Sequence, residues 1–396
     1  MAERKYGKEY GFLTRAVHTG NDVDKDTGAI KRPITMANSY ELPYDPTDLN
    51  WSSAGKALYT RNGGANQQYL QEKLASLENG EDCVVLASGV AALSSVFFTL
   101  LNTGDHVIFS DVTYIAVYRL FNELLKNKYN IDTTIVNTSN LDEIKKAIRP
   151  NTKLIHIETP GNPTLKISDI EQIAKIAHEN NILLSVDNTF ASPYNQRPID
   201  FGADIVVESL TKYINGHGDA MGGAVIASKE IVSKIKAEAM INLGGAISPF
   251  NAWLIMRGAV TLPLRMRQHN ENALKVARFL EDLNAVSFVA YPGLESHEGY
   301  DIAKKQMTGF SGVLSFGLKA DHDTHNKFVS YLKVITSAVS LGHDESLIVF
   351  LGEEDERQYL YPEEFKNGFF RFSVGIEDVE DIIGDIKQAL EKINLL

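Results

Sequence analysis

Residues 182–223 read ILLSVDNTFASPYNQRPIDFGADIVVESLTKYINGHGDAMGG and contain the two apolar runs that decide the fold. The runs ILLSVD and DIVVESL are apolar almost throughout, which is typical of strands that are buried on both faces of a parallel sheet. Asp187 ends the first run, and Lys212 follows the second. Because neighbouring parallel strands end at the same edge of a sheet, we expect Asp187 and Lys212 to face one cleft.

An acidic side chain and a lysine on opposite sides of a flat cleft suit pyridoxal phosphate. The lysine would hold the cofactor covalently, and the acid would keep its pyridine nitrogen protonated, so that the ring accepts electrons from a carbanion. Ser209 and Thr211 flank the lysine and could hold the phosphate. Alternatively, Lys212 is a surface lysine after a strand and Asp187 caps a helix. Each residue alone permits that interpretation, but the pair together favours the cofactor.

Several strings of residues carry a resemblance to a known family. They are VDNTFASPYNQRP, ESLTKYINGHGD and IETPGNPT, with LASGVAA and RFSVGIED further away in the chain. Over nearly its whole length the chain resembles the pyridoxal-phosphate enzymes of cysteine and methionine metabolism, the transsulfuration group of cystathionine gamma-lyase, methionine gamma-lyase and cystathionine gamma-synthase. The resemblance implies the α/β fold type I of pyridoxal-phosphate-dependent transferases, with pyridoxal 5'-phosphate as cofactor. It also implies a homotetramer built as a dimer of dimers, with active sites shared across subunits.

Composition excludes several classes of partner. A net charge of −12 argues against nucleic acid or an anionic membrane surface, because both require a basic face. The single cysteine, Cys83, excludes an intramolecular disulfide and favours a reducing compartment. The first residues lack the apolar core of a secretory signal, so we expect a cytoplasmic protein. The uncharged run over 84–101 is long enough for a membrane span, but a strand, a glycine turn and a buried helix explain it equally well.

The chain divides into three parts by pattern. Residues 1–57 show little periodicity and several turn signals, which predicts an extended N-terminal arm. Residues 58–256 alternate strand and helix patterns, including a helix over roughly Gln67 to Glu78. This alternation predicts a large cofactor-binding domain with a mostly parallel sheet of about seven strands. Residues 257–396 combine helices with separated strands, which predicts a smaller α+β C-terminal domain.

The resemblance assigns further residues to the cofactor. It implies that Tyr59 and Arg61 bind the phosphate of a neighbouring subunit, and that Gly89 and Val90 bind it at a helix start. A helix start with a glycine suits phosphate in any case, because backbone N–H groups point outward there. The matching residues that line or stack on the cofactor ring are Tyr114, Glu158 and Asn162.

Arg371 is the candidate for binding the substrate's α-carboxylate. In GFFRFSVG, strand alternation sends Phe370 and Phe372 to one face and Arg371 to the other. An arginine directed away from the core can bind a carboxylate through two parallel hydrogen bonds, although a surface ion pair is an equal alternative. The resemblance favours carboxylate binding and adds Asn162 and Ser340 as further contacts.

The expected reaction is an α,γ-elimination on a sulfur amino acid. By resemblance Lys212 removes the α-proton and Tyr114 is the acid for the leaving group, giving a 2-oxo acid, ammonia and a thiol. Val339 stands where members acting on cystathionine often carry glutamate, which favours an uncharged, methionine-like or homocysteine-like thioether. However, Ala116 stands where methionine-cleaving members often carry cysteine, and GEEDERQYLYPEEF departs from the loop that is usual in the family.

Other activities on the same scaffold stay open. They are cystathionine gamma-lyase or gamma-synthase, a transferase of the O-acetylhomoserine sulfhydrylase type, and an amino-acid racemase. His217 and the other histidines lack a second histidine or a carboxylate at ligand spacing, so we expect no metal site.

Overall fold

Two sheets organise the molecule. The computed structural model describes residues 6–45, 47, 58–352 and 355–396, and in these ranges the larger sheet has seven strands in the order β1-β7-β6-β5-β4-β2-β3. The strand β7 pairs antiparallel with both of its neighbours, β1 and β6, and the other pairs of neighbouring strands are parallel. The predicted mostly parallel sheet is therefore confirmed. Its strands are β1 (Asp82–Leu86), β2 (His106–Ser110), β3 (Asp132–Val136), β4 (Thr152–Glu158), β5 (Leu183–Asp187), β6 (Ile205–Ser209) and β7 (Gly223–Ala227).

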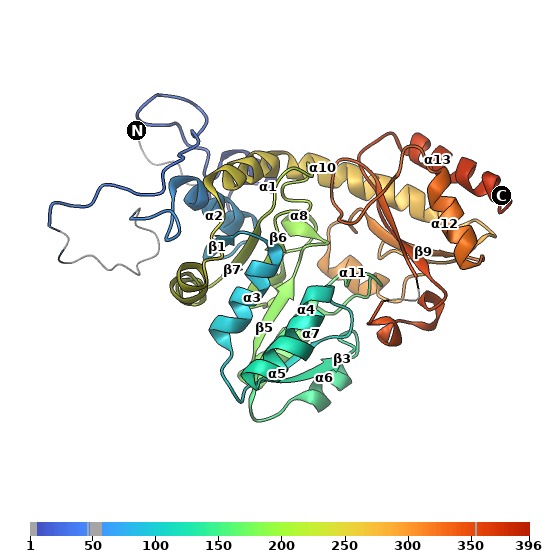
Figure 1. Cartoon of the computed structure of the whole chain (residues 1–396), viewed down its shortest axis with the longest axis horizontal. Helices are drawn as coiled ribbons and strands as arrows, with labels where there is room; N and C mark the ends of the chain where they lie inside the picture. The colour runs from blue at the N-terminus through green and yellow to red at the C-terminus, as the bar shows by residue number, and fades with distance from the viewer. Residues whose placement is uncertain (1–5, 46, 48–57, 353–354) are drawn as a thin grey trace.

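Helices cover both faces of this sheet, and the apolar runs of the sequence reflect that burial (Figure 1). In β1, Val84 and Leu86 belong to the core that includes α3, whereas Cys83 and Val85 belong to the core that includes α2. The helices of this domain and of the arm are α1 (Phe12–His18), α2 (Ala65–Leu77), α3 (Gly89–Leu100), α4 (Ile115–Arg119), α5 (Lys126–Tyr129), α6 (Leu141–Ala147), α7 (Ile170–Glu179), α8 (Ser192–Asn195) and α9 (Lys229–Ile235). Short 3₁₀ or π-helical segments are η1 (Leu120–Leu125), η2 (Pro198–Phe201), η3 (Lys236–Leu243), η4 (Gln358–Leu360) and η5 (Glu363–Phe365).

The second domain is built on a smaller sheet in the order β10-β11-β12-β9-β8. The helix α13 packs on this core through Ile382, Ile386 and Leu390, which recur every four residues and are buried. The remaining elements of this part are α10 (Pro249–Glu281), β8 (Val286–Ala290), α11 (Tyr300–Gln306), β9 (Val313–Leu318), α12 (His322–Tyr331), β10 (Thr336–Ser337), β11 (Leu347–Leu351), β12 (Phe369–Ser373) and α13 (Val379–Lys392).

The long helix α10 joins the two domains. It begins at the large domain and ends in the second one, and Figure 1 shows it running from one to the other. The predicted domain boundary after residue 256 therefore falls inside a continuous helix. Ser248 caps its start by accepting a hydrogen bond from the Asn251 backbone N–H, and Pro249 follows at the first helical position.

Two local expectations change. The predicted arm contains the helix α1, where buried Arg15 donates hydrogen bonds to the Ser76 carbonyl and to Asn79. These partners are distant in sequence, so no local pattern indicates the helix. Residues 84–101 form most of β1, a turn and α3 rather than a membrane span. None of the helices in the described residues is both long enough and apolar enough to span a membrane.

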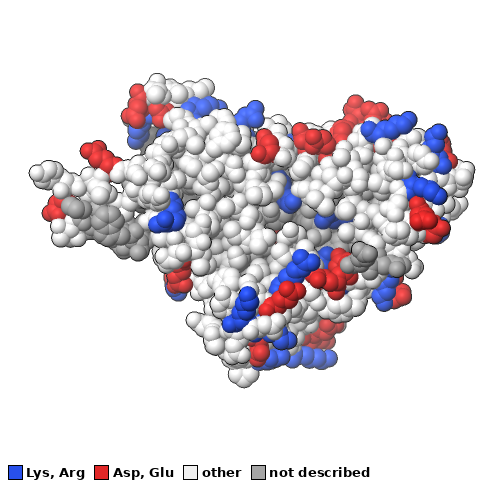
Figure 2. All heavy atoms as spheres, in the orientation of Figure 1, with Lys and Arg blue, Asp and Glu red and all other residues white. Residues whose placement is uncertain are grey.

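Charged side chains of both signs are interspersed on the face shown in Figure 2. Some Lys and Arg atoms are visible near the middle of this face, where the two domains meet.

Candidate active site

A cavity of about 640 Å³ between the two domains is the candidate site. Its floor consists of residues that follow the carboxyl ends of the parallel strands, and its other wall comes from β11, β12 and the segments before them. Of the residues predicted from sequence, the cavity is lined by Gly89, Val90, Tyr114, Glu158, Asn162, Asp187, Ser209, Thr211, Lys212, Val339, Ser340 and Arg371.

Tyr59 and Arg61 lie outside this cavity of their own chain. The Arg61 guanidinium lies over the Tyr59 ring, 5.1 Å from its centroid. Residues 46 and 48–57, which contain the end of the predicted arm, are outside the described part of the chain.

Lys212 lies three residues beyond β6 and reaches the middle of the cavity. Its Nζ donates a hydrogen bond of 2.7 Å to Ser340 Oγ. Burial, with a smaller contribution from Arg371, lowers the pKa of Lys212 to about 8. Ser340 adopts φ of 91°, a conformation that is unfavourable for a residue with a side chain and that often occurs at functional sites. A lysine with such a pKa can hold or release a proton near neutral pH.

Asp187 and Glu158 end adjacent parallel strands and face each other in register. Burial raises the pKa of Asp187, and hydrogen bonds from Thr189 offset this only in part. Burial and the neighbouring Asp187 raise the pKa of Glu158 to about 8. Glu158 accepts hydrogen bonds from the backbone N–H groups of Tyr114, at 2.6 Å, and Asn162, at 2.9 Å. Glu158 thereby holds both neighbours in place, while Asp187 is left as a buried carboxyl suited to a cationic partner.

The start of α3 forms a cradle for an anion. Ser88 caps the helix by accepting a hydrogen bond from the Ala91 backbone N–H at 3.1 Å. A Cβ atom on Gly89 would lie 2.9 Å from Ser209 Oγ, so only glycine allows this close approach. The first N–H groups of a helix have no intrahelical partner and favour a phosphate.

Arg371 enters the cavity from β12, and strand alternation is as predicted, with Phe370 and Phe372 fully buried. Its guanidinium donates to Asn162 Oδ1 at 3.2 Å and to the Ser340 carbonyl at 3.0 Å. Both acceptors are uncharged, and Arg371 Nε is buried without a hydrogen-bond partner in the described residues. A guanidinium in this state suits a carboxylate ligand.

These groups together fit pyridoxal phosphate. A lysine amine, a buried carboxyl group and a helix-start cradle lie around one cavity, which is the donor set that the cofactor's aldehyde, pyridine nitrogen and phosphate require. Residues 13–391 match the family model described as Cys/Met metabolism PLP-dependent enzyme. The chain belongs to this family. The predicted fold class and the predicted cofactor are thereby confirmed.

Members of the family with different names resemble the chain over nearly its full length. A protein of Rhizobium leguminosarum bv. trifolii named canavanine gamma-lyase is 57% identical over 387 residues, which cover 96% of both chains. A protein of Fusobacterium nucleatum subsp. polymorphum named L-methionine gamma-lyase is 42% identical, covering 98% of this chain and 99% of the other. The crystal structure of cystathionine gamma-lyase from Lactobacillus plantarum, complexed with L-serine, has a TM-score of 0.88 at 35% identity. It covers 97% of this chain and 100% of that chain.

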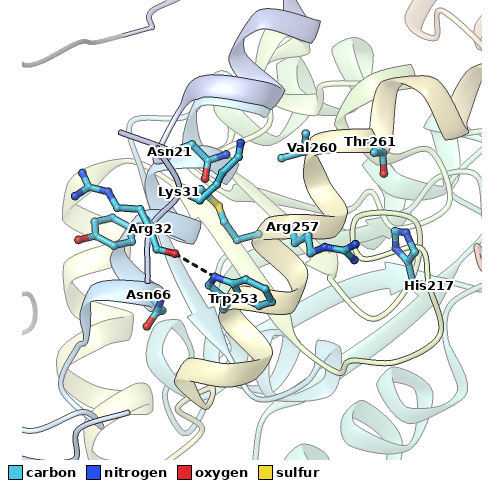
Figure 3. A pocket seen from close by; sticks show the side chains of 11 residues that line it. Asn21, Lys31, Arg32, Asn66, His217, Trp253, Arg257, Val260 and Thr261 are labelled. Carbon is cyan, nitrogen blue, oxygen red and sulfur yellow. Dashed lines mark hydrogen bonds between the residues drawn. The ribbon is translucent and has the colours of Figure 1, made fainter. Parts of the chain in front are cut away.

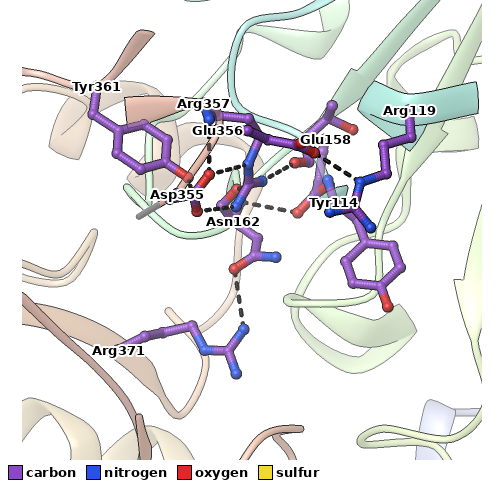
Figure 4. A network of polar contacts seen from close by, with 10 residues as sticks. Tyr114, Arg119, Glu158, Asn162, Asp355, Glu356, Arg357, Tyr361 and Arg371 are labelled. Atoms are coloured by element: carbon purple, nitrogen blue, oxygen red, sulfur yellow. Dashed lines mark hydrogen bonds and ion pairs between the residues drawn. The ribbon is translucent and has the colours of Figure 1, made fainter. Parts of the chain in front are cut away.

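A group of charged residues at the far end of the cavity was not predicted as part of the site. Figure 4 shows this group above Asn162 and Tyr114, whereas Arg371 lies below them. The residues of this group lie partly in the acidic stretch GEEDERQYLYPEEF, which departs from the loop that is usual in the family. Its run of charged residues was the signal in the sequence that could have indicated this part of the site. The additional residues that line the cavity there are Arg119, Asp355, Glu356 and Arg357.

A second cavity, of about 350 Å³, lies between the N-terminal segment and α10 (Figure 3). Basic side chains and apolar ones, among them Trp253 and Met256, line it together, and Trp253 Nε1 donates a hydrogen bond to the Arg32 carbonyl at its edge. Lys212 and Asp187 do not line it. Among the described residues, no group of three or more His, Cys, Asp or Glu side chains is arranged to hold a metal ion.

Proposed function

We propose that the chain is a pyridoxal-phosphate-dependent lyase that cleaves canavanine, an amino acid whose γ-carbon carries a guanidinooxy group. The observation that carries this proposal is the 57% identity to the relative named canavanine gamma-lyase, against 42% to the one named for methionine. The far end of the cavity supports it, because Glu356 lines it and a carboxylate is a natural partner for a guanidinium group. The substrate would thus differ from the thioether that we expected from Val339.

Most of the predicted site residues have a role in this proposal. Arg371, with Asn162 and Ser340, binds the substrate's α-carboxylate. Lys212 holds the cofactor and moves the α-proton, and Asp187 keeps the pyridine nitrogen protonated. The bound cofactor supplies an electron sink that makes the protons on the α- and β-carbons removable. The phosphate is held by the start of α3 together with Ser209 and Thr211.

Tyr114 is placed to serve the leaving group. It lines the cavity, its side chain is 43% exposed, and its backbone N–H is fixed by Glu158. In the proposed reaction the Cγ–O bond breaks and the departing oxygen takes a proton, which Tyr114 supplies, so that hydroxyguanidine leaves. With one water molecule, the four-carbon remainder is released as 2-oxobutanoate and ammonia, or as homoserine when the water adds at the γ-carbon.

A substrate panel tests the proposal. We expect kcat/KM for canavanine to exceed that for methionine, homocysteine and cystathionine by about tenfold or more, since only canavanine carries a guanidinium that can form a charge-assisted hydrogen bond with a carboxylate of the cavity. Hydroxyguanidine, thiol, 2-oxo acid, ammonia and homoserine are measured together. A higher kcat/KM for any of the thioethers would reject canavanine as the preferred substrate.

The thioether remains the second candidate because of one specific observation. Val339 lines the cavity, is 76% exposed and presents an apolar surface to a substrate side chain. The same panel, extended with an activated homoserine ester plus sulfide, detects the transferase by its homocysteine. Alanine and glutamate scored for inversion without ammonia detect the racemase.

Asp187→Asn is expected to stabilise the cofactor-free protein and to weaken its stabilisation by pyridoxal phosphate. Because the pKa of Asp187 is raised in the folded state, its carboxylate destabilises the fold once the pH exceeds the unfolded value of about 4. We therefore expect the cofactor-free variant to melt about 2 °C higher than wild type at pH 8, with the difference vanishing toward pH 4.

Thermal denaturation with and without pyridoxal phosphate measures both effects. Asp142→Asn serves as the control, because the Asp142 side chain is 76% exposed. Equal melting temperatures of the cofactor-free wild type and Asp187→Asn at pH 8 would contradict the expectation.

Assembly and location remain predictions. We propose that Tyr59 and Arg61 bind the cofactor phosphate of a neighbouring subunit, which agrees with their position outside the cavity of their own chain. A homotetramer in the cytoplasm is the arrangement that we expect.

A further inference from the structure

The strongest feature not yet explained is the ion pair at the far end of the cavity. Arg119 Nε lies 2.8 Å from Glu356 Oε1, and both residues line the cavity. Arg119 is the last residue of α4 in the large domain, whereas Glu356 lies in the segment before η4 in the second domain. The ion pair therefore connects the two domains at this end of the cavity. We propose that Glu356 is the receptor for the substrate's guanidinium group, and that Arg119 occupies this receptor until the substrate displaces it. This inference rests on the proposed function for the identity of the substrate.

Glu356, rather than its neighbour Asp355, has capacity for a ligand. Both Asp355 oxygens are already occupied, because Oδ1 accepts from Arg357 Nε at 3.0 Å and Oδ2 accepts from Arg357 Nη2 at 2.7 Å and from Tyr361 at 2.8 Å. Within the described part of the chain, Glu356 has one hydrogen bond, from Arg119 to Oε1. Glu356 is therefore the carboxylate that can accept a new guanidinium.

The Glu356 segment has an anchor that does not depend on Arg119. Buried Arg357 donates to the Thr113 carbonyl in the large domain, besides its two bonds to Asp355. The Tyr359 and Tyr118 hydroxyls also lie 3.0 Å apart. Glu356 therefore stays at the cavity when Arg119 moves away.

Exchange of one guanidinium for another is physically easy here. The Arg119 and Glu356 side chains are 58% and 38% exposed, so water and salt screen their attraction. Arg119 already presents a guanidinium to Glu356, and the protonated guanidinooxy group of canavanine offers the same N–H donors. Figure 4 shows Arg371 and Glu356 on opposite sides of Asn162 and Tyr114. Arg371, Tyr114 and Glu356 line the same cavity. A molecule with its carboxylate on Arg371 and its guanidinium on Glu356 would therefore share that cavity with Tyr114, the proposed acid.

Arginine and norleucine are suitable probes, because arginine has canavanine's shape with CH₂ in place of the leaving oxygen, and norleucine lacks the guanidinium. Their inhibition constants and calorimetric dissociation constants are measured on the cofactor-loaded enzyme. For Glu356→Gln we expect arginine to bind about three- to tenfold more weakly, since a charge-assisted hydrogen bond that solvent partly screens is lost, and norleucine to change much less. For Arg119→Met we expect arginine to bind about two- to fivefold more tightly, because the competing cation is gone.

Glu364→Gln is the matched control, because Glu364 is exposed on the following segment and does not line the cavity. If Glu364→Gln and Glu356→Gln weaken arginine binding equally, or if arginine binds more tightly to Glu356→Gln, Glu356 is not the receptor for the guanidinium. Weaker arginine binding in Arg119→Met would show that Arg119 does not compete with the ligand for Glu356. If wild type fails to cleave canavanine but its arginine binding depends on Glu356, the proposed function fails and the receptor stands. If canavanine is cleaved and Glu356→Gln leaves arginine binding unchanged, only the receptor fails.

Discussion

Lys212→Ala is expected to abolish turnover and to remove the visible absorbance of the lysine-bound cofactor. In this variant no amine remains at Ser340 Oγ to hold the cofactor or to move the α-proton. Loss of the proton transfer alone predicts a fall in kcat of about 10²- to 10⁴-fold, and loss of covalent attachment adds to it. Turnover is followed by product release, and cofactor attachment by the absorbance spectrum after gel filtration.

Ser340→Ala is the companion variant, because it removes the partner of Lys212 but leaves the amine. We expect Ser340→Ala to retain the absorbance band and to lose much less activity. A yellow, active Lys212→Ala enzyme would show that another residue holds the cofactor, and the proposed site would then be wrong.

Arg371→Met is expected to raise KM for every amino-acid substrate by about 10²- to 10³-fold, because it removes one partner of a buried charge pair. Arg371 Nε is buried without a partner in the described residues, and its other donors reach only uncharged oxygens. The guanidinium is thus arranged for a carboxylate, and the effect is independent of which γ-substituent the substrate carries.

Arg371→Lys tests whether geometry matters as well as charge. A lysine cannot form two parallel hydrogen bonds with a carboxylate, so we expect it to restore only a small part of the affinity. Esters of the same amino acids test the other side of this contact, because they lack the free carboxylate. Wild type should bind these esters as poorly as Arg371→Met binds the free acids. Near-normal KM values in Arg371→Met would assign the α-carboxylate to another residue.

The position of a site residue follows from the sequence where a local pattern determines it. The position of Asp187 follows from the end of an apolar run, because neighbouring parallel strands bring such ends together whatever the rest of the chain does. Arg371 follows from strand alternation, because Phe370 and Phe372 determine which face is core.

Other features depend on contacts that no local pattern contains. Arg119 and Glu356 are 237 residues apart, and the acidic stretch does not reveal which of its charges faces the cavity. The helix α1 is stabilised by contacts of Arg15 with a distant helix end. The strand β11 is apolar, but a short apolar run does not distinguish a strand from other buried structure.

Because the cavity lies between two domains, every bound amino acid connects one domain to the other. Its carboxylate would be attached to the lobe that carries β12, and its amine to the lobe that carries β5 and β6, while α10 keeps the two lobes in one piece. Part of the free energy of ligand binding is therefore used to hold the two domains in their relative position. A mutation that makes α10 less rigid should weaken the binding of all ligands alike, although the mutated residue contacts none of them.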